Sequence, residues 1–152
     1  MPPVTTLPPL DVEEDALVRA LGRVMAVAPK LIDADLRRDA GISLTEYSTL
    51  MHLSESPERR MRMSELASAC DLSLSGMTRA VARLESDGLV ERFQCDEDGR
   101  GWFASLTDAG FARLEAAYPT HLVATRRRIL DHFAGVDLTA VTRAFDAISA
   151  GD

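Results

Sequence analysis

The sequence is poor in cysteine, lysine and long apolar runs, and each scarcity argues against a class of protein. Its two cysteines can form at most one disulfide, so a disulfide-stapled secreted scaffold is not expected. No stretch approaches the ~20 consecutive apolar residues of a membrane span, and the proline-rich start lacks the basic and apolar parts of a secretion signal. We therefore expect a cytoplasmic protein with reduced thiols and no membrane partner.

Catalytic signatures are missing as well. The chain contains no phosphate-binding loop, no dinucleotide-binding glycine pattern, no zinc-protease helix motif and no nucleophile-elbow pentapeptide. Its histidines are scattered, and His121 and His132 stand about three helical turns apart, which is too far for them to share one ion. We expect no enzymatic activity, no cofactor and no metal site.

The residues that are present describe one globular domain with an unfavourable charge for binding nucleic acid. The 152 residues are 46% hydrophobic and 27% charged, which is ordinary for a folded soluble domain. The net charge of −7 opposes binding to a polyanion, whose affinity comes from clustered basic side chains. All basic residues except Lys30 are arginine, which suits phosphates and guanine edges but is equally explained by a GC-rich genome.

The first 42 residues divide into an arm and a long helix. Residues 1–10 hold four of the seven prolines and no charge, which predicts a flexible arm. Asp11 and Glu14 have the capping-box spacing, so the segment 11–42 is predicted to hold a helix that kinks near Pro29 and closes near Asp39, with Gly41 as its stop signal. The helix has two apolar rows and needs two packing partners. These rows are Leu17, Leu21, Val24, Ala28 and Leu31, and Val18, Met25 and Ile32.

The middle of the chain has the pattern of a helix-turn-helix. Three serines occupy capping positions ahead of helical apolar periods. The predicted helices begin at Ser43, Ser64 and Ser73 and run to residues 56, 70 and 87. Residues 57–62 are expected to form a polar connection, and Gly88 is expected to stop the last helix. Only a tight turn separates the second and third helices, which is typical of this DNA-binding motif.

After Gly88 the apolar period changes from that of a helix to that of a strand. Residues 89–94 and 102–106 alternate between apolar and polar, with a polar turn at 96–101, which predicts a β-hairpin wing. Residues 43–107 would then form a winged helix-turn-helix lobe. Residues 108–152 are predicted to form two helices capped by Thr107 and Asp137, with a bend at Pro119. Their expected inward residues are Phe111, Leu114, Tyr118, Leu122, Ile129 and Phe133, and then Leu138, Val141, Phe145 and Ile148.

The helix after Ser73 separates its side chains by face. Its inward residues are Met77, Ala80, Val81 and Leu84. The opposite side is narrow and rich in small residues, which suits a major groove about 12 Å wide, and its first-turn N–H groups favour phosphate. We assign Arg79 to a base edge, preferably guanine, and Arg83 to a phosphate or a second base, the alternative being an ordinary solvated helix. The candidate DNA-binding residues are Ser64, Ser73, Ser75, Gly76, Thr78, Arg79, Arg83 and, on the wing, Arg100.

Four segments in this order, residues 64–67, 78–85, 87–92 and 105–110, resemble the motifs of the MarR family of winged helix-turn-helix transcriptional regulators. The resemblance extends over about residues 11–150. It implies a mainly α fold of six helices with a small β wing, in which residues 11–42 and 108–152 form a homodimer on a pseudo-palindromic double-stranded DNA operator. The surplus apolar faces of the first and last helices independently favour a second chain, although a double-faced helix also occurs in the core of monomers.

In this family the DNA is usually released by a small molecule, which binds between the dimer helices and the DNA-binding lobe. By that resemblance we expect an apolar slot with a cationic end, suited to an aromatic carboxylate. Its candidate residues, which serve equally well as core and surface, are Arg19, Arg23, Tyr47, Met51 and His52. Thiol sensing, used by some members, is not expected, because the first helix has no cysteine, Cys70 is predicted to be core and acids flank Cys95.

The wing departs from the family pattern. Related sequences carry two consecutive arginines at the tip, whereas Gly99 and Arg100 stand here behind three acidic residues. Residues 57–107 hold seven Arg against nine Asp and Glu, a net charge of −2, so we expect modest DNA affinity that falls steeply with salt. The predicted function is a homodimeric, sequence-specific DNA-binding repressor released by a small aromatic ligand. The alternative is a winged-helix interaction or sequestering protein that has lost specific DNA binding.

Overall fold

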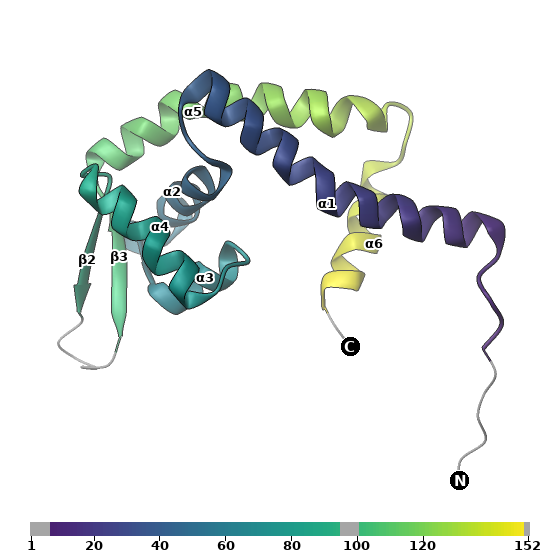
Figure 1. Cartoon of the computed structure of the whole chain (residues 1–152), viewed down its shortest axis with the longest axis horizontal. Helices are drawn as coiled ribbons and strands as arrows, with labels where there is room; N and C mark the ends of the chain where they lie inside the picture. Colours follow the sequence, from purple (N-terminus) through teal and green to yellow (C-terminus); the bar gives the residue numbers. More distant parts are fainter. Residues whose placement is uncertain (1–6, 95–100, 151–152) are drawn as a thin grey trace, which may run out of the picture.

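The computed structural model of the chain describes residues 7–94 and 101–150. These residues form a compact lobe at one end and long helices that reach away from it (Figure 1). The elements are α1 (Val12–Ala40), α2 (Leu44–Glu55), η1 (Pro57–Arg59), β1 (Arg60–Arg62), α3 (Met63–Ala69), α4 (Leu74–Ser86), β2 (Val90–Gln94), β3 (Trp102–Leu106), α5 (Asp108–Arg128), η2 (Leu130–Phe133) and α6 (Leu138–Ala150). None of the helices in the described ranges is long and apolar enough to cross a membrane.

The six α-helices and the winged arrangement confirm the predicted fold class. Local capping chemistry accounts for most helix boundaries. Asp11 with Glu14, and Ser43 with Glu46, each form a complete capping box at the starts of α1 and α2. Gly41 ends α1 at a φ of 64°, a left-handed conformation that glycine adopts without steric cost.

The start of α3 differs from the prediction. The helix begins at Met63 and has no side-chain cap, so Ser64 lies inside its first turn instead of capping it. The reason is that Arg62 belongs to strand β1, and the chain passes from strand to helix without an intervening loop residue.

Strand β1 was not predicted from the sequence. It pairs antiparallel with β3, with Met61 opposite Ala104, so the sheet has three strands in the order β1-β3-β2. The polar connection expected at residues 57–62 is therefore half 3₁₀ turn and half strand. A three-residue strand with two arginines has no apolar period that would predict it. The strand forms because it pairs with another strand about 40 residues later in the chain.

The core lies in the lobe and fixes the orientation of α4. Its side chains come from the end of α1 and from α2, α3, α4, β2, β3 and α5; the largest fully buried ones are Leu36, Leu50, Leu53, Leu66, Met77 and Leu84. The predicted inward face of α4 is buried throughout. Burial of this face leaves the opposite side of α4 at the molecular surface.

The long helices are buried only near the lobe. Ile32 and Leu36 at the end of α1 join the core, whereas Leu17, Val24 and Met25 are exposed in the single chain. Pro29 does not interrupt α1.

Helix α5 ends earlier than predicted. Ile129 and Phe133 fall after its last residue, and Tyr118 and Leu122, expected inside, are exposed in the single chain. The apolar stripe expected on α6 is also at the surface; Leu138, Phe145 and Ile148 are all exposed.

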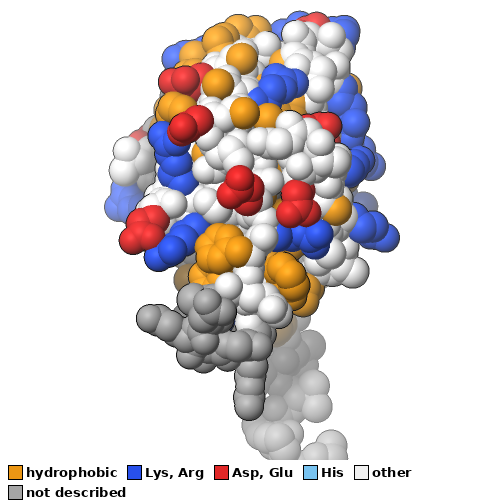
Figure 2. Space-filling model, turned by 90° about the vertical axis from the view of Figure 1, so that its left-hand side faces the viewer, with side chains coloured by type: hydrophobic (Ala, Val, Ile, Leu, Met, Phe, Trp, Pro, Cys, Tyr) orange, Lys and Arg blue, Asp and Glu red, His pale blue; other side chains and the backbone are white. Residues whose placement is uncertain are grey.

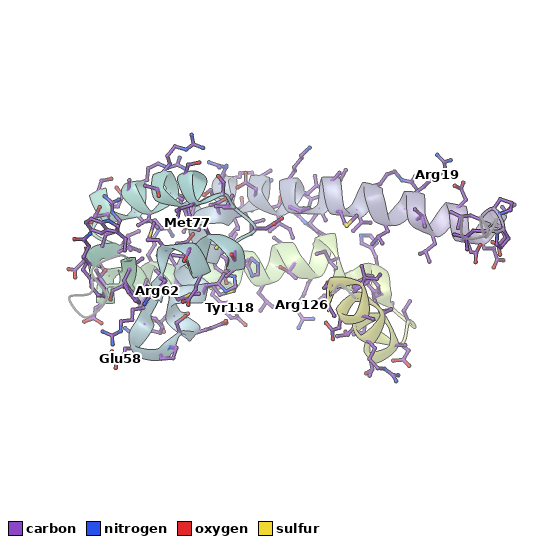
Figure 3. All side chains as sticks on the ribbon, turned by 90° about the horizontal axis from the view of Figure 1, so that it is seen from below. Arg19, Glu58, Arg62, Met77, Tyr118 and Arg126 are labelled. Carbon is purple, nitrogen blue, oxygen red and sulfur yellow. The ribbon has the colours of Figure 1, made fainter. Side chains whose placement is uncertain are left out.

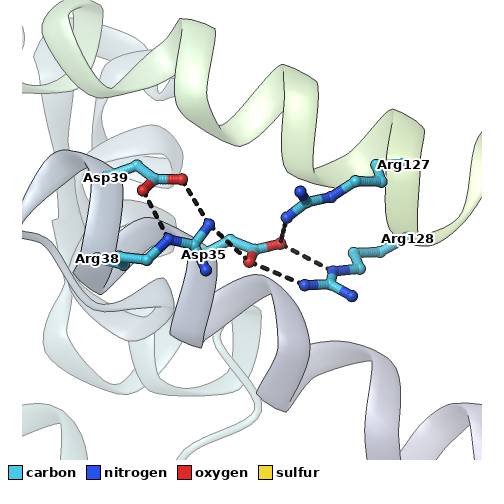
Figure 4. A network of polar contacts seen from close by, with 5 residues as sticks. All are labelled: Asp35, Arg38, Asp39, Arg127 and Arg128. Carbon is cyan, nitrogen blue, oxygen red and sulfur yellow. Dashed lines mark hydrogen bonds and ion pairs between the residues drawn. The ribbon is translucent and has the colours of Figure 1, made fainter.

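A buried carboxylate joins α1 to α5, which lie side by side (Figure 1). Asp35 is 1% exposed and receives a bidentate pair from Arg128, with Nε and Nη2 2.9 and 3.0 Å from its oxygens. Arg127 and Arg38 approach the same carboxylate at 2.8 and 3.1 Å (Figure 4). Arg128 and Arg127 hydrogen-bond to this carboxylate and hold the pKa of Asp35 well below its ordinary value.

Gly110 allows α5 to pack closely against the wing, and alanine at this position is expected to destabilise the protein. A Cβ there would lie 2.1 Å from the Leu89 carbonyl oxygen and 2.6 Å from a methyl carbon of Leu106. The carbonyl cannot move freely because it accepts a hydrogen bond from Thr107. We expect Gly110→Ala to lower the free energy of unfolding by about 1–3 kcal/mol, measured by urea denaturation.

Gly22→Ala is the matched control, because a Cβ at Gly22 meets no atom within 4 Å. It should leave stability equal or raise it by up to about 1 kcal/mol. If Gly110→Ala is as stable as the parent, the close packing of α5 on the wing does not contribute to the stability of the protein.

Candidate nucleic-acid interface

Helices α3 and α4 are joined by a tight turn that sets the angle of α4. Asp71 in the turn has a φ of 53°, a left-handed conformation that aspartate tolerates better than most residues. The Leu72 amide donates to the carbonyl of Ala67 and closes the turn onto α3. The arrangement is a helix-turn-helix whose second helix, α4, is buried on one face and exposed on the other.

The first turn of α4 is built around Ser73. The Ser73 hydroxyl accepts a hydrogen bond from the Gly76 amide at 3.1 Å, which confirms Ser73 as the cap. The Ser75 hydroxyl lies 3.1 Å from that of Ser73, and Thr78 donates its hydroxyl to the Leu74 carbonyl at 2.8 Å. These hydroxyls hold the helix start in place, and its N-terminal dipole faces outward, where a phosphate can approach.

Arg79 and Arg83 project from the exposed face of α4. Neither side chain forms a hydrogen bond or ion pair with any residue that the structure describes. The one acidic residue of α4, Glu85, is instead held by Arg92 of β2, with Arg92 Nε 2.9 Å from its carboxylate. The acid on the helix is thereby neutralised from the wing, and both outward guanidinium groups remain available to a partner.

A hollow of about 350 Å³ lies between α4 and the wing, and we call it the wing hollow. It brings together two predicted residues, Ser64 and Thr78, which are separated in sequence. Arg62, Leu74, Arg92 and Trp102 also line it. Arg62 of β1 packs its guanidinium 4.9 Å from the centre of the Phe103 ring and lies beside α4 at the lobe end of the molecule (Figure 3).

None of these four residues is among the DNA-binding residues predicted from the sequence. Arg92 could have been found from strand alternation, because it shares a face of β2 with buried Val90 and so turns toward α4. Arg62 carried no such signal, since β1 was not predicted. Arg100 and the rest of the segment 95–100 lie outside the described residues.

The surface at the wing end of the molecule carries both signs of charge. Figure 2 shows basic and acidic side chains interspersed there, without a continuous basic tract. This mixture agrees with the net charge of −2 counted over residues 57–107. Long-range attraction to a polyanion is therefore weak, and binding to DNA depends on the particular arginines that reach it.

A second cavity, of about 390 Å³, lies between α2 and α5, and we call it the α2–α5 cavity. It is lined by Tyr47, Met51, Glu55, Leu114, Glu115 and Tyr118, among others. Two of the five predicted ligand residues, Tyr47 and Met51, are in this wall. His52 is half-buried on α2 outside it.

The two arginines proposed as a cationic end do not line the α2–α5 cavity. Arg19 pairs with Asp15 at 2.7 Å near the outer end of α1, far from Tyr118 (Figure 3), and Arg23 is exposed one turn further on. The charged groups at this cavity within one chain are the carboxylates of Glu55 and Glu115.

His121 and Cys70 are packed into the protein and have the surroundings of structural residues. His121 stacks on buried Tyr47 with ring centres 4.3 Å apart, and burial lowers the pKa of His121. Burial raises the pKa of the Cys70 thiol, which makes it a poor nucleophile. In residues 7–94 and 101–150 no group of three His, Cys, Asp or Glu side chains is placed to hold a metal ion.

The chain is similar to bacterial transcriptional regulators. The family model described as the MarR family matches residues 40–101. The HTH-type transcriptional regulator YkoM of Bacillus subtilis is 30% identical over 133 residues, which cover 84% of this chain and 82% of YkoM.

Two solved structures from Streptomyces coelicolor are similar over nearly the full length. Sco3205, a MarR family transcriptional regulator crystallised in complex with DNA, is 34% identical with a TM-score of 0.85, covering 95% of this chain and 91% of Sco3205. AbsC, also a MarR family transcriptional regulator, is 33% identical with a TM-score of 0.83, covering 95% of this chain and 97% of AbsC. With its exposed helix α4, winged sheet and long flanking helices, the chain belongs to the MarR family of DNA-binding transcriptional regulators.

Proposed function

We propose that the protein is a homodimeric, sequence-specific repressor that binds a pseudo-palindromic DNA operator. One α4 helix of the dimer enters the major groove of each half-site, and a small molecule bound at the α2–α5 cavity releases the DNA. The observation that carries the proposal is the exposed face of α4, on which Arg79 and Arg83 are unpaired among the described residues.

Each part of this face has a chemical role. Arg79 lies near the middle of the exposed surface and presents a planar fork that fits the O6 and N7 acceptors of guanine. Arg83 lies one turn later and contacts a phosphate, while Ser64 and the Ser73 to Thr78 turn approach the backbone on the other side. The similar protein Sco3205 was crystallised in complex with DNA, which supports DNA as the partner of this chain.

Dimerisation is supported by apolar side chains that the single chain leaves in water. They lie on the two helices at the ends of the chain and on α5, and they include Leu17, Met25, Val123, Phe145 and Ile148. Monomeric soluble proteins rarely expose large apolar patches, and a second copy of the chain would cover these side chains. The first helix thus has the two packing partners that its two apolar rows require.

Repression and release follow from the same architecture. A dimer that occupies promoter DNA blocks transcription because it covers the DNA that the transcription machinery must bind. No contact between the two proteins is needed. The α2–α5 cavity joins the DNA-binding lobe to a long helix, so a ligand there can change their relative orientation. Tyr47 and Tyr118 offer ring faces to an aromatic ligand.

The test is binding to a duplex selected by the protein from a random DNA library, followed by fluorescence anisotropy at low and moderate salt. We expect Arg79→Ala to lose about 1–3 kcal/mol of discrimination between the selected duplex and one with a substituted half-site. Arg83→Ala should weaken binding to both duplexes equally and flatten the salt slope by about two units, because each subunit of the dimer loses one phosphate contact. Arg126→Ala, which removes an exposed arginine of α5, is the control for charge and should bind like the parent.

The mixed charge of the wing end favours one other function, an interaction or sequestering protein without specific DNA binding (Figure 2). If selection yields no preferred sequence and binding is weak at both salt concentrations, this second function replaces the first. If both arginine variants bind the selected duplex like the parent, the assignment of α4 is wrong.

A further inference from the structure

The exposed face of α4 carries apolar groups in a row as well as arginines. Leu74, Thr78 and Ala82 stand four residues apart, so they follow one another along the helix with a shift of about 40° at each step. All three are exposed. We call this row the apolar ridge of α4.

Leu74 is the largest side chain of the ridge, and a large apolar side chain is unusual on an otherwise polar helix face. It is 55% exposed at the first position of α4, although the core begins only three residues later at Met77. It lines the wing hollow together with Trp102, which is 51% exposed. Two large apolar side chains therefore face an open hollow at the start of the helix that reads DNA.

Thr78 contributes a methyl group to the ridge. Its hydroxyl donates a hydrogen bond to the Leu74 carbonyl at 2.8 Å and is thereby committed to the helix backbone. The methyl group is then the part of the side chain left for a partner, and Ala82 offers another methyl one turn later. Arg79 lies on the neighbouring line of the same exposed face, so polar and apolar groups stand beside each other.

Thymine is the one base with a methyl group in the major groove; cytosine has only a C5–H at that place, and the groups that distinguish the other bases are hydrogen-bond donors and acceptors. A recognition helix with an apolar ridge therefore gains more from thymine than from any other base at those positions. We infer that the apolar ridge of α4, and Leu74 above all, recognises thymine methyl groups in each half-site. This inference rests on the proposed function and adds a specificity determinant to it.

The test removes only the methyl group. In the selected duplex each thymine is replaced singly by deoxyuridine, which keeps Watson–Crick pairing and every hydrogen-bonding group. For the parent protein we expect at least one replacement per half-site to weaken binding about fourfold, the equivalent of one methyl group removed from water. In the Leu74→Ala variant the same replacement should leave affinity nearly unchanged, since the contact is already gone.

Matched variants make the comparison specific. Ser75→Ala, on the same turn, should keep the fourfold penalty for uracil, and Leu74→Met should keep most of it because the apolar volume is retained. Leu74 is exposed, so its truncation should not unfold the lobe, and an unchanged helical circular dichroism spectrum checks this.

The outcomes separate this inference from the proposed function. A parent protein that prefers its selected duplex but binds every uracil-substituted form equally well would overturn the ridge and leave the proposed function standing. An equal uracil penalty in the parent and in Leu74→Ala would overturn the assignment of the methyl contact to Leu74 and would also leave the proposed function standing. Failure to select any preferred duplex would overturn both.

Discussion

Replacing Phe145 by glutamate is expected to convert the dimer into a monomer and to lower affinity for a two-site operator by about 10²–10⁴-fold. Phe145 is 45% exposed in the single chain and lies with Leu138 and Ile148 on one side of α6. If a second copy covers this stripe, a carboxylate there would be buried without a partner, which the interface cannot tolerate. Loss of the dimer removes the avidity of two linked half-site contacts.

Sedimentation equilibrium and anisotropy with one-site and two-site duplexes measure the two effects separately. The monomer should bind a single half-site as the parent does, because the lobe that carries α4 has its own core. Thr139→Glu is the control, since it adds the same charge to the opposite side of α6 near the helix N-terminus, where an acid is favourable. A Phe145→Glu protein that stays dimeric at micromolar concentration would refute the assignment of α6 to the interface.

Removing the carboxylate of Asp35 is expected to lower the free energy of unfolding by about 3 kcal/mol. Breaking a buried ion pair typically costs about 3–5 kcal/mol because a charge is left without its partner. The lower end applies here, since Arg38 and Arg127 keep about half of their side chains in water and can be hydrated after the change. Asp35→Ala also removes the link between α1 and α5, which holds the lobe against the long helices (Figure 4).

The effect of Asp35 should depend on pH in a defined direction. Its folded-state pKa lies well below the unfolded value near 3.9, because Arg128 and Arg127 hydrogen-bond to it. A lowered folded-state pKa stabilises the protein above the unfolded pKa, and this stability is lost as the pH falls toward the folded-state value. The parent should therefore exceed Asp35→Asn in free energy of unfolding by about 1 kcal/mol less at pH 3 than at pH 7.

Urea denaturation at both pH values measures this difference. Asp39→Ala is the matched control, because Asp39 is an exposed acid that pairs with Arg38 one turn from Asp35. An exposed ion pair contributes little, so this variant should unfold like the parent at both pH values. Equal stability of Asp35→Ala and Asp39→Ala would show that the buried network does not hold α1 against α5.

The helix boundaries that could be predicted from the sequence depend on local chemistry. Asp11 with Glu14, and Ser43 with Glu46, meet their partners three residues away, so capping is encoded within one turn. The faces of α4 were also predictable, because the apolar period of Met77, Val81 and Leu84 defines the buried side and thereby the exposed one. Arg79 and Arg83 followed from this assignment.

Features that join distant segments were decided only by the tertiary structure. Strand β1 exists because Arg60–Arg62 pairs with β3, and Asp35 is buried because Arg128 reaches it from 93 residues away. The wing hollow likewise combines Arg62 of β1, Leu74 of α4 and Trp102 of β3. By itself, the sequence determined which helices form and which side of each is apolar, since both depend on neighbours within a few residues. Which side chains meet across helices and strands was settled by packing, because long-range contacts leave no period in the chain.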